Sequence, residues 1–96
     1  MVEVRETDAF KAWRKALKDP RAQKQIVARL TRLTYGLMGD IKPVGEGVSE
    51  LRIHLGPGYR IYIVEREQVL IIVLCGGDKS SQAQDIEKAK ALAREI

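Results

Sequence analysis

Residues 48–79 read VSELRIHLGPGYRIYIVEREQVLIIVLCGGDK, and this stretch decides the fold. Polar and apolar side chains alternate from Glu50 to Leu55, which is the period of a strand with one buried face. The run Val69–Leu74 is apolar at every position, which favours a strand covered on both faces. Short connections at Gly56–Gly58 and Arg66–Gln68 separate the apolar runs. The stretch therefore predicts three consecutive antiparallel strands.

The glycines of the first connection permit positive φ, so a tight hairpin turn is expected there. If Gly56–Gly58 closes a three-residue loop, Leu55 lies opposite Tyr59. The expected register then continues across both hairpins, pairing Ile53 with Ile61, Leu51 with Ile63, Arg52 with Tyr62, His54 with Arg60, Ile61 with Val73 and Arg60 with Leu74. A slip of one residue would mix apolar and polar positions. The register therefore predicts an apolar face and a polar face that carries Arg52, His54, Arg60 and Tyr62.

The N-terminal third predicts a strand and a helical hairpin. Val2–Arg5 alternates like a short strand, and Thr7 or Asp8 is suited to cap the helix that follows. Asp19-Pro20 has the residue types of an N-cap and first helical position, so a second helix should begin there. Its apolar stripe, which ends before Gly36, is formed by Ile26, Leu30 and Leu33.

The rest of the chain predicts a loop and a final helix. Residues 37–47 contain three glycines and a proline, which are typical of a loop. Gly76-Gly77 allows a sharp exit from the last strand, and Ser81–Gln84 has the spacing of a capping box. The predicted order β-α-α-β-β-β-α over residues 1–96 indicates a single α+β domain. We expect a four-stranded antiparallel sheet, with the N-terminal two-helix hairpin on its apolar face and a C-terminal helix.

Composition restricts the class of protein. Lys and Arg exceed Asp and Glu by 17 to 13, and the excess is concentrated in residues 1–35, which carry nine basic and four acidic residues. We interpret these cations mainly as the solvated face of the helical hairpin, with a general electrostatic contribution to polyanion binding. The single Cys75 supports neither a disulfide framework nor a four-ligand zinc site. Neither a signal peptide nor a membrane span is apparent, so a cytoplasmic protein is expected.

Three segments carry a resemblance to a known family. ELRIH at 50–54, GPGYRIY at 56–62 and LCGGDKSSQ at 74–82, which Asp85 and Ile86 follow closely, resemble the addiction-module killer proteins. These HigB-like proteins are a branch of the RelE/ParE superfamily of type II toxin–antitoxin toxins. The resemblance extends over nearly the whole chain, and GGDKSSQ is its most specific part.

This resemblance implies a function and partners. It implies a bacterial cytoplasmic toxin that cuts messenger RNA on the ribosome without a metal or other cofactor. It also implies neutralisation by a cognate helix-turn-helix antitoxin, in a possible toxin–antitoxin heterotetramer. Two alternatives stay open: a non-nuclease inhibitor of DNA gyrase, as in the ParE branch, and an inactive relative that only binds antitoxin or regulates its operon.

The resemblance also assigns roles to residues. Arg60 matches the arginine that stabilises charge on the phosphate, while Arg52, His54 and Lys79 match further basic positions. His54 is the single histidine, and imidazole is the side chain best suited to exchange a proton near neutral pH. Without the family match, we would interpret His54 as an ordinary surface residue and Lys79 as a solvated residue leading into the helix.

Two further residues are predicted to bind substrate. Tyr62 is suited to stack on an RNA base, and Gln82 follows the glycines closely, although a capping role would also explain it. Cleavage needs a second proton-transfer group besides His54. Tyr62, Lys79 and Asp85 are the alternatives for that group, and the sequence does not choose among them.

Overall fold

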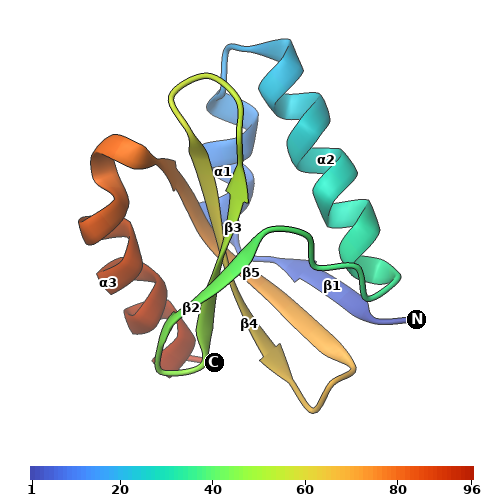
Figure 1. The fold of residues 1–96 in the computed structure, drawn as a ribbon. Coiled ribbons are helices and arrows are strands. Elements are labelled where there is room, and N and C mark those ends of the chain that lie inside the picture. The colour runs from blue at the N-terminus through green and yellow to red at the C-terminus, as the bar shows by residue number, and fades with distance from the viewer.

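The computed structural model describes residues 1–96 and contains five strands, three α-helices and one short 3₁₀ helix (Figure 1). In chain order the elements are β1 (Glu3–Glu6), α1 (Asp8–Ala16), α2 (Pro20–Thr34), β2 (Ile41–Gly45), β3 (Val48–Ile53), β4 (Tyr59–Arg66), β5 (Leu70–Asp78), η1 (Lys79–Ser81) and α3 (Gln82–Arg94). No helix of the structure combines the length and the apolar character needed to cross a membrane.

All five strands form one mixed sheet of order β1-β5-β4-β3-β2. The α+β class is confirmed, but the predicted four-stranded antiparallel sheet is wrong in two details. β1 runs parallel to β5, and an additional strand, β2, pairs with β3 at the edge of the sheet. β2 lies inside residues 37–47, which the sequence predicts as a loop. That prediction rested on residue types such as Pro43 and Gly45, which are typical of loops. Both residue types are tolerated in edge strands, where fewer ladder hydrogen bonds are needed.

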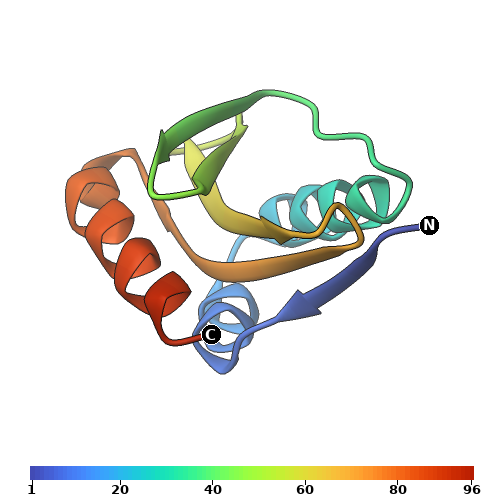
Figure 2. The same cartoon turned by 90° about the horizontal axis from the view of Figure 1, so that it is seen from below.

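Helices cover both faces of the sheet (Figure 2). On one face, Phe10 of α1 and Ile26 and Leu33 of α2 are buried against the apolar side of β3, β4 and β5. On the other face, Ala89 and Ala93 of α3 pack with a second cluster that includes residues of the same three strands. The expectation that β5 is covered on both sides is confirmed, as is the place of the helical hairpin on the apolar face.

The register of the first hairpin differs from the expected one by two residues. Ile53 pairs with Tyr59 and Arg52 with Arg60, so the connection is a five-residue loop over residues 54–58. The amide of Gly58 closes it by donating to the carbonyl of Leu55 at 3.1 Å. A shift of two residues keeps every side chain on its predicted face. The apolar and polar side chains therefore still lie on separate faces, but His54 belongs to the loop and not to β3.

The second hairpin contains a β-bulge that the sequence reasoning missed. Tyr62 pairs with Cys75 but Ile63 pairs with Val73, which leaves Leu74 as the extra residue. The expected register is wrong throughout this hairpin, because Val73 pairs with Ile63 rather than Ile61, and beyond the bulge Arg60 lies beside Gly77 rather than Leu74. The bulge lets Leu74 and Cys75 both join the cluster beneath α3.

Gly76 and Gly77 are part of β5 and do not form the predicted turn. A Cβ on Gly76 would lie 2.4 Å from the ring of Trp13, and a Cβ on Gly77 would lie 1.8 Å from the carboxylate of Asp85. The pair thus allows close approach of α1 on one face and α3 on the other. The turn follows at Asp78, which forms a capping box with Ser81, so the predicted Ser81–Gln84 box is wrong.

Local signals for the N-terminal helices are confirmed. The hydroxyl of Thr7 accepts from the amide of Phe10 at 3.1 Å and caps α1. Asp19 caps α2 by accepting from the amide of Arg21 at 2.9 Å, and Pro20 opens that helix. These two caps determine where the helical hairpin starts and where it bends.

Candidate functional site

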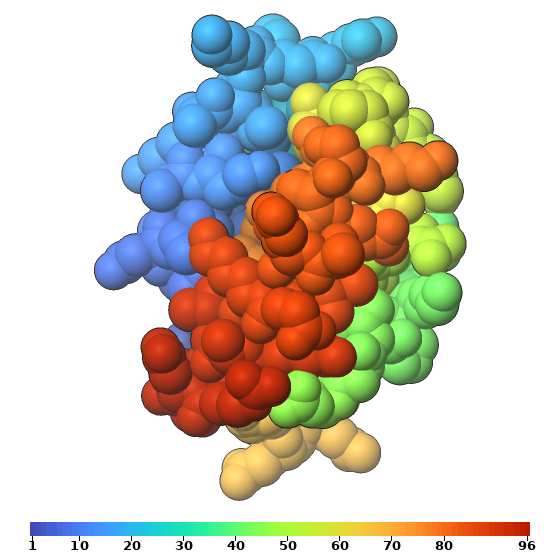
Figure 3. Space-filling view, turned by 90° about the vertical axis from the view of Figure 1, so that its left-hand side faces the viewer, coloured from blue at the N-terminus to red at the C-terminus, as the bar shows by residue number.

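A depression of about 460 Å³ lies at the end of the β3–β4 hairpin. It brings together three of the four predicted catalytic residues, and its lining is formed by His54, Leu55, Gly56, Pro57, Gly58, Arg60 and Lys79. Figure 3 shows the hairpin loop, in yellow, beside the segment that leads into α3, in orange, at the upper end of the face that α3 covers. Residues that are far apart in the sequence therefore share one concave surface.

Arg60 provides the deepest cation of this depression. Its side chain is only 13% exposed, and its Nη1 donates to the carbonyl of Gly58 at 2.7 Å. The Nε atom is buried and has no hydrogen-bond partner, since the nearest carboxylate oxygen, on Glu50, lies 3.8 Å away. Because Nε is buried, a ligand in the depression would meet Arg60 through its terminal nitrogens.

Lys79 approaches the same depression from the start of η1. It is exposed and makes no ion pair in the structure. Gly58 lies close to it, because a Cβ on that glycine would be 3.7 Å from the Cβ of Lys79 and 3.0 Å from Nη1 of Arg60. The glycine thus leaves room for both cations at one wall of the depression.

Glu50 organises the polar residues behind the depression, and the sequence reasoning assigned it no role. Its carboxylate is completely buried and accepts from Arg52 Nε at 2.9 Å, Gln82 Nε2 at 2.8 Å and the Tyr62 hydroxyl at 3.3 Å. Burial by itself would raise the pKa of Glu50. The hydrogen bonds from Arg52 and Gln82, together with the positive charge of Arg60, outweigh burial and hold that pKa below its ordinary value.

The structure corrects the role predicted for Tyr62. This side chain is completely buried beneath α3, so it offers no surface on which a base could stack. Burial raises the pKa of its hydroxyl, with a further contribution from the charge of Glu50, so the hydroxyl stays protonated. The error arose because strand alternation indicated a second face without showing that α3 would cover half of it.

Arg52 and Gln82 lie beside the depression and not in its lining. The Arg52 side chain is 31% exposed, and its Nε is bound to Glu50. The amide nitrogen of Gln82, the first residue of α3, is bound to the same carboxylate. Their predicted roles in catalysis and substrate binding stay predictions.

His54 follows β3 and is 77% exposed, and its Nε2 lies 2.6 Å from Oδ2 of Asp40. This hydrogen bond holds the pKa of Asp40 below its ordinary value. The sequence does not single out Asp40, because residues 37–47 have only the composition of a loop. Of the alternatives for a second proton-transfer group, Asp85 is held by the Ser81 hydroxyl at 2.5 Å and Tyr62 is buried. Lys79 is therefore the remaining one in the depression.

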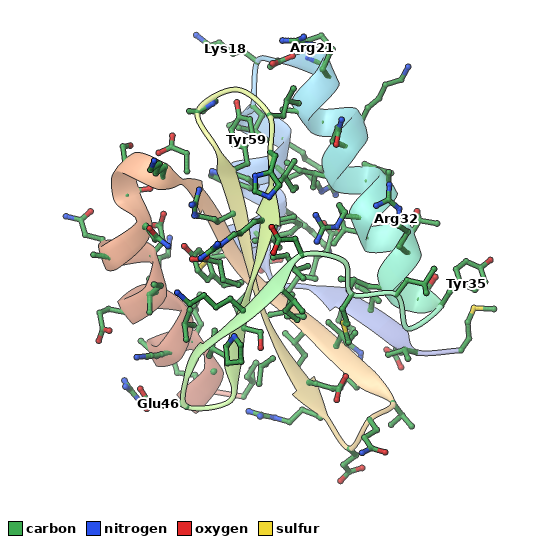
Figure 4. The ribbon with its side chains drawn as sticks, viewed as in Figure 1. Lys18, Arg21, Arg32, Tyr35, Glu46 and Tyr59 are labelled. Atoms are coloured by element: carbon green, nitrogen blue, oxygen red, sulfur yellow. The ribbon has the colours of Figure 1, made fainter.

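The arrangement is suited to an anion. Two cations and an imidazole line a depression, and the Glu50 carboxylate near Arg60 is completely buried behind Arg52 and Arg60. No group of three or more His, Cys, Asp or Glu side chains is placed to hold a metal ion. Figure 4 shows Lys18 and Arg21 at the α1–α2 corner, at the same end of the molecule as Tyr59 and the hairpin loop. That end therefore carries more positive charge than the depression alone.

The fold has a known counterpart. No protein-family model matches the chain. A solved structure of an arginine-to-alanine double mutant of the Escherichia coli toxin RelE, in the free state, superposes with a TM-score of 0.69. It shares 19% sequence identity, and the match covers 99% of this chain and 98% of that one. This likeness shows a RelE-like fold, while membership of the HigB-like branch stays a prediction.

A relative in sequence is an uncharacterized protein of Haemophilus influenzae. It is 48% identical over 95 residues, which cover 99% of this chain and 96% of the relative. Identity at that level over the full length of both chains indicates common descent and the same fold. The chain therefore belongs to the family of this Haemophilus influenzae protein, and its fold is that of RelE.

Proposed function

We propose that this protein is the toxin of a type II toxin–antitoxin system and an endoribonuclease that cuts messenger RNA on the ribosome. The observation that carries the proposal is the depression in which His54, Arg60 and Lys79 meet. The RelE-like fold supports the toxin class. We further propose that it acts in the cytoplasm and that a cognate antitoxin, of the helix-turn-helix type, neutralises it. A toxin–antitoxin heterotetramer is part of the same proposal.

The geometry suggests a division of labour for RNA cleavage. Arg60 binds the scissile phosphate, because its partly unpaired guanidinium forms two parallel hydrogen bonds with phosphate oxygens. It also stabilises the charge that develops on the pentacoordinate phosphorus. Glu50 keeps Arg52 oriented behind this site without facing the substrate, since its carboxylate is completely buried. The negative charge of Glu50 is thereby shielded from the RNA.

The reaction balances with two proton transfers. His54 takes the proton of the 2′-hydroxyl while the 2′-oxygen forms a bond to phosphorus. The bond between phosphorus and the 5′-oxygen breaks, and the 5′-oxygen leaves with the bonding pair and takes a proton from the Lys79 ammonium. The products are a 2′,3′-cyclic phosphate and a free 5′-hydroxyl. Each proton transfer by a positioned side chain contributes a factor of roughly 100 to 10,000 to the rate.

The decisive experiment compares Arg60→Ala with a matched control, Arg32→Ala. Arg32 is exposed on α2, and its side chain makes no hydrogen bond or ion pair in the structure (Figure 4). We expect Arg60→Ala to remain folded and to slow cleavage of ribosome-bound message by roughly 100- to 1,000-fold, while Arg32→Ala cleaves at the wild-type rate. Cleavage is measured by primer extension on purified ribosomes, and folding by circular dichroism.

Other results would overturn the proposal. A folded Arg60→Ala protein that cleaves at the wild-type rate would remove Arg60 from the mechanism. Intact message together with an early loss of DNA supercoiling after induction would instead favour a gyrase inhibitor. In that case the cations of the helical hairpin, Arg32 included, would matter more than the depression.

A further inference from the structure

His54 is held by a carboxylate that lies outside the strands. Asp40 Oδ2 is 2.6 Å from Nε2 of the imidazole. An ionised carboxylate only accepts hydrogen bonds, so Nε2 carries the proton and donates it to Asp40. The other ring nitrogen, Nδ1, has no protein partner in the structure. Nδ1 is therefore the nitrogen left free to take a proton, and His54 lines the depression.

The position of Asp40 is fixed by a buried arginine of α2. Arg29 is 8% exposed, and its guanidinium donates to the carbonyl oxygens of Arg52 at 2.6 Å, Met38 at 3.1 Å and Asp40 at 3.5 Å. The amide of Arg52 also donates to the Asp40 carbonyl at 3.0 Å. Burial lowers the pKa of Arg29, yet no carboxylate pairs with it. These carbonyl contacts therefore satisfy a charge that would otherwise be costly to bury.

The backbone beside Asp40 is shaped to fit this arginine. Gly39 has a φ of +68°, which favours glycine, and a Cβ there would lie 2.9 Å from Nη2 of Arg29. The backbone can pass over the guanidinium of Arg29 only at a residue without a side chain. Asp40, the next residue, is thus presented to His54 by backbone that Arg29 and β3 hold in place. This support makes the exposed Asp40–His54 contact more defined than an ordinary surface ion pair.

We propose that Asp40 is a positioning residue that fixes the tautomer and orientation of His54, so that Nδ1 accepts the proton of the 2′-hydroxyl. This inference rests on the proposed ribonuclease function. Asp40 stays ionised throughout, and it touches neither the RNA nor the reacting atoms. Its carboxylate accepts from the Nε2–H group before the proton transfer and stabilises the imidazolium after it. Arg29 and Gly39 act one step further away, because they hold the backbone of Asp40.

The first test needs no activity. Nitrogen NMR of the His54 ring, in the free protein at a pH where the ring is neutral, should show Nε2 protonated and Nδ1 unprotonated. In Asp40→Asn the amide can also donate, so Nε2 no longer has to carry the proton, and both ring signals should move towards the average of two tautomers. Asp8→Asn, on the exposed first turn of α1, is the matched control and should leave the ring signals unchanged. Ring signals that are identical in wild type and Asp40→Asn would overturn the proposal.

The second test separates positioning from folding. Asp40→Asn should lower kcat for cleavage by roughly 10- to 100-fold with little change in KM, which is less than the loss caused by His54→Ala. In the His54→Ala background, Asp40→Asn should not lower kcat any further, because a residue that acts through His54 then has no imidazole to position. If Asp40→Asn lowers kcat by the same factor in the presence and in the absence of His54, Asp40 has a general structural role and the proposal is wrong.

The two tests also distinguish this inference from the function on which it rests. If the wild-type protein cleaves no RNA, the proposed function is wrong, and Asp40 has no role in catalysis. The ring signals of the free protein then decide alone whether Asp40 fixes the tautomer of His54. If the wild type cleaves and Asp40→Asn cleaves equally well, the function stands and the proposed role of Asp40 is wrong.

Discussion

The two faces of the sheet are covered by helices in different ways. The face beneath α1 and α2 has an apolar core, with Leu51, Ile61 and Ile71 completely buried. The face beneath α3 is apolar at one end, around Val64, but at the other end it holds the completely buried carboxylate Glu50 among charged and polar side chains. The same three strands therefore stabilise the fold with one face and build a site with part of the other.

The difference follows from what each helix brings to the sheet. α1 and α2 bury large side chains such as Phe10 and Leu33, whereas the buried residues of α3 are the small Ala89 and Ala93. The first residue of α3 is Gln82, whose side-chain amide donates a hydrogen bond to the Glu50 carboxylate. A helix with a narrow apolar stripe thus covers part of a sheet face and leaves polar side chains at its end with access to water.

The largest effect is expected on the apolar face. Ile61→Ala removes a completely buried side chain from the apolar cluster that β3, β4 and β5 form with α1 and α2, so the free energy of unfolding should fall by about 2–5 kcal/mol. Chemical denaturation monitored by circular dichroism measures this loss. A loss below about 1 kcal/mol would mean that the cluster can collapse around the missing atoms, and the face would not be the main source of stability.

A smaller effect with a pH signature is expected at Glu50. Glu50→Ala leaves Arg52, Gln82 and Tyr62 without their shared acceptor, so the free energy of unfolding should fall by about 1–3 kcal/mol. Glu50→Gln keeps the shape and an acceptor but loses the charge, so the Ala variant should lose more stability than the Gln variant. Denaturation of both variants at neutral pH measures the difference.

The pH dependence of this effect has a definite sign. The folded protein lowers the pKa of Glu50, so its charge contributes stability above the unfolded value, and that contribution is lost as pH falls through the folded pKa. The stability difference between wild type and Glu50→Gln should therefore shrink between about pH 6 and pH 3. A difference that stays constant over this range would contradict an ionised Glu50.

The smallest effect is expected for Tyr62→Phe. The phenyl ring keeps the packing beneath α3 and loses only the hydrogen bond from the hydroxyl to Glu50, which is long at 3.3 Å. The free energy of unfolding should change by about 0.5–1.5 kcal/mol, and RNA cleavage should stay within a factor of a few. If cleavage instead fell as far as in Arg60→Ala, Tyr62 would have a role in the reaction that its burial does not suggest.

The sequence predicted those parts of the fold that depend on neighbouring residues. Thr7 and Asp19-Pro20 mark the helix starts, and alternation in Glu50–Leu55 sorts side chains onto two faces, because caps and strand period are local properties. The pairing of β1 with β5, the strand β2 and the bulge at Leu74 depend on distant partners. Their sequence signals are weak, and the sequence reasoning missed them.

The site was predicted in part for the same reason. A register error of two residues keeps a side chain on its face, so Arg60 and His54 were predicted on one surface, and both line the depression. Glu50 shares a strand face with Arg52, two residues away, and that spacing was a usable signal for an ion pair. Asp40 and Arg29 had no such signal, because backbone carbonyls of a loop connect them.

The first strand and the last one depend on each other during synthesis. β1 lies beside β5, and the Thr7 hydroxyl donates to the carbonyl of Leu74, 67 residues further along the chain. A nascent chain still short of residue 70 therefore exposes an unpaired leading strand, and Glu50 gains its Gln82 partner later still. β1 therefore reaches its place in the sheet only after β5 has been synthesised.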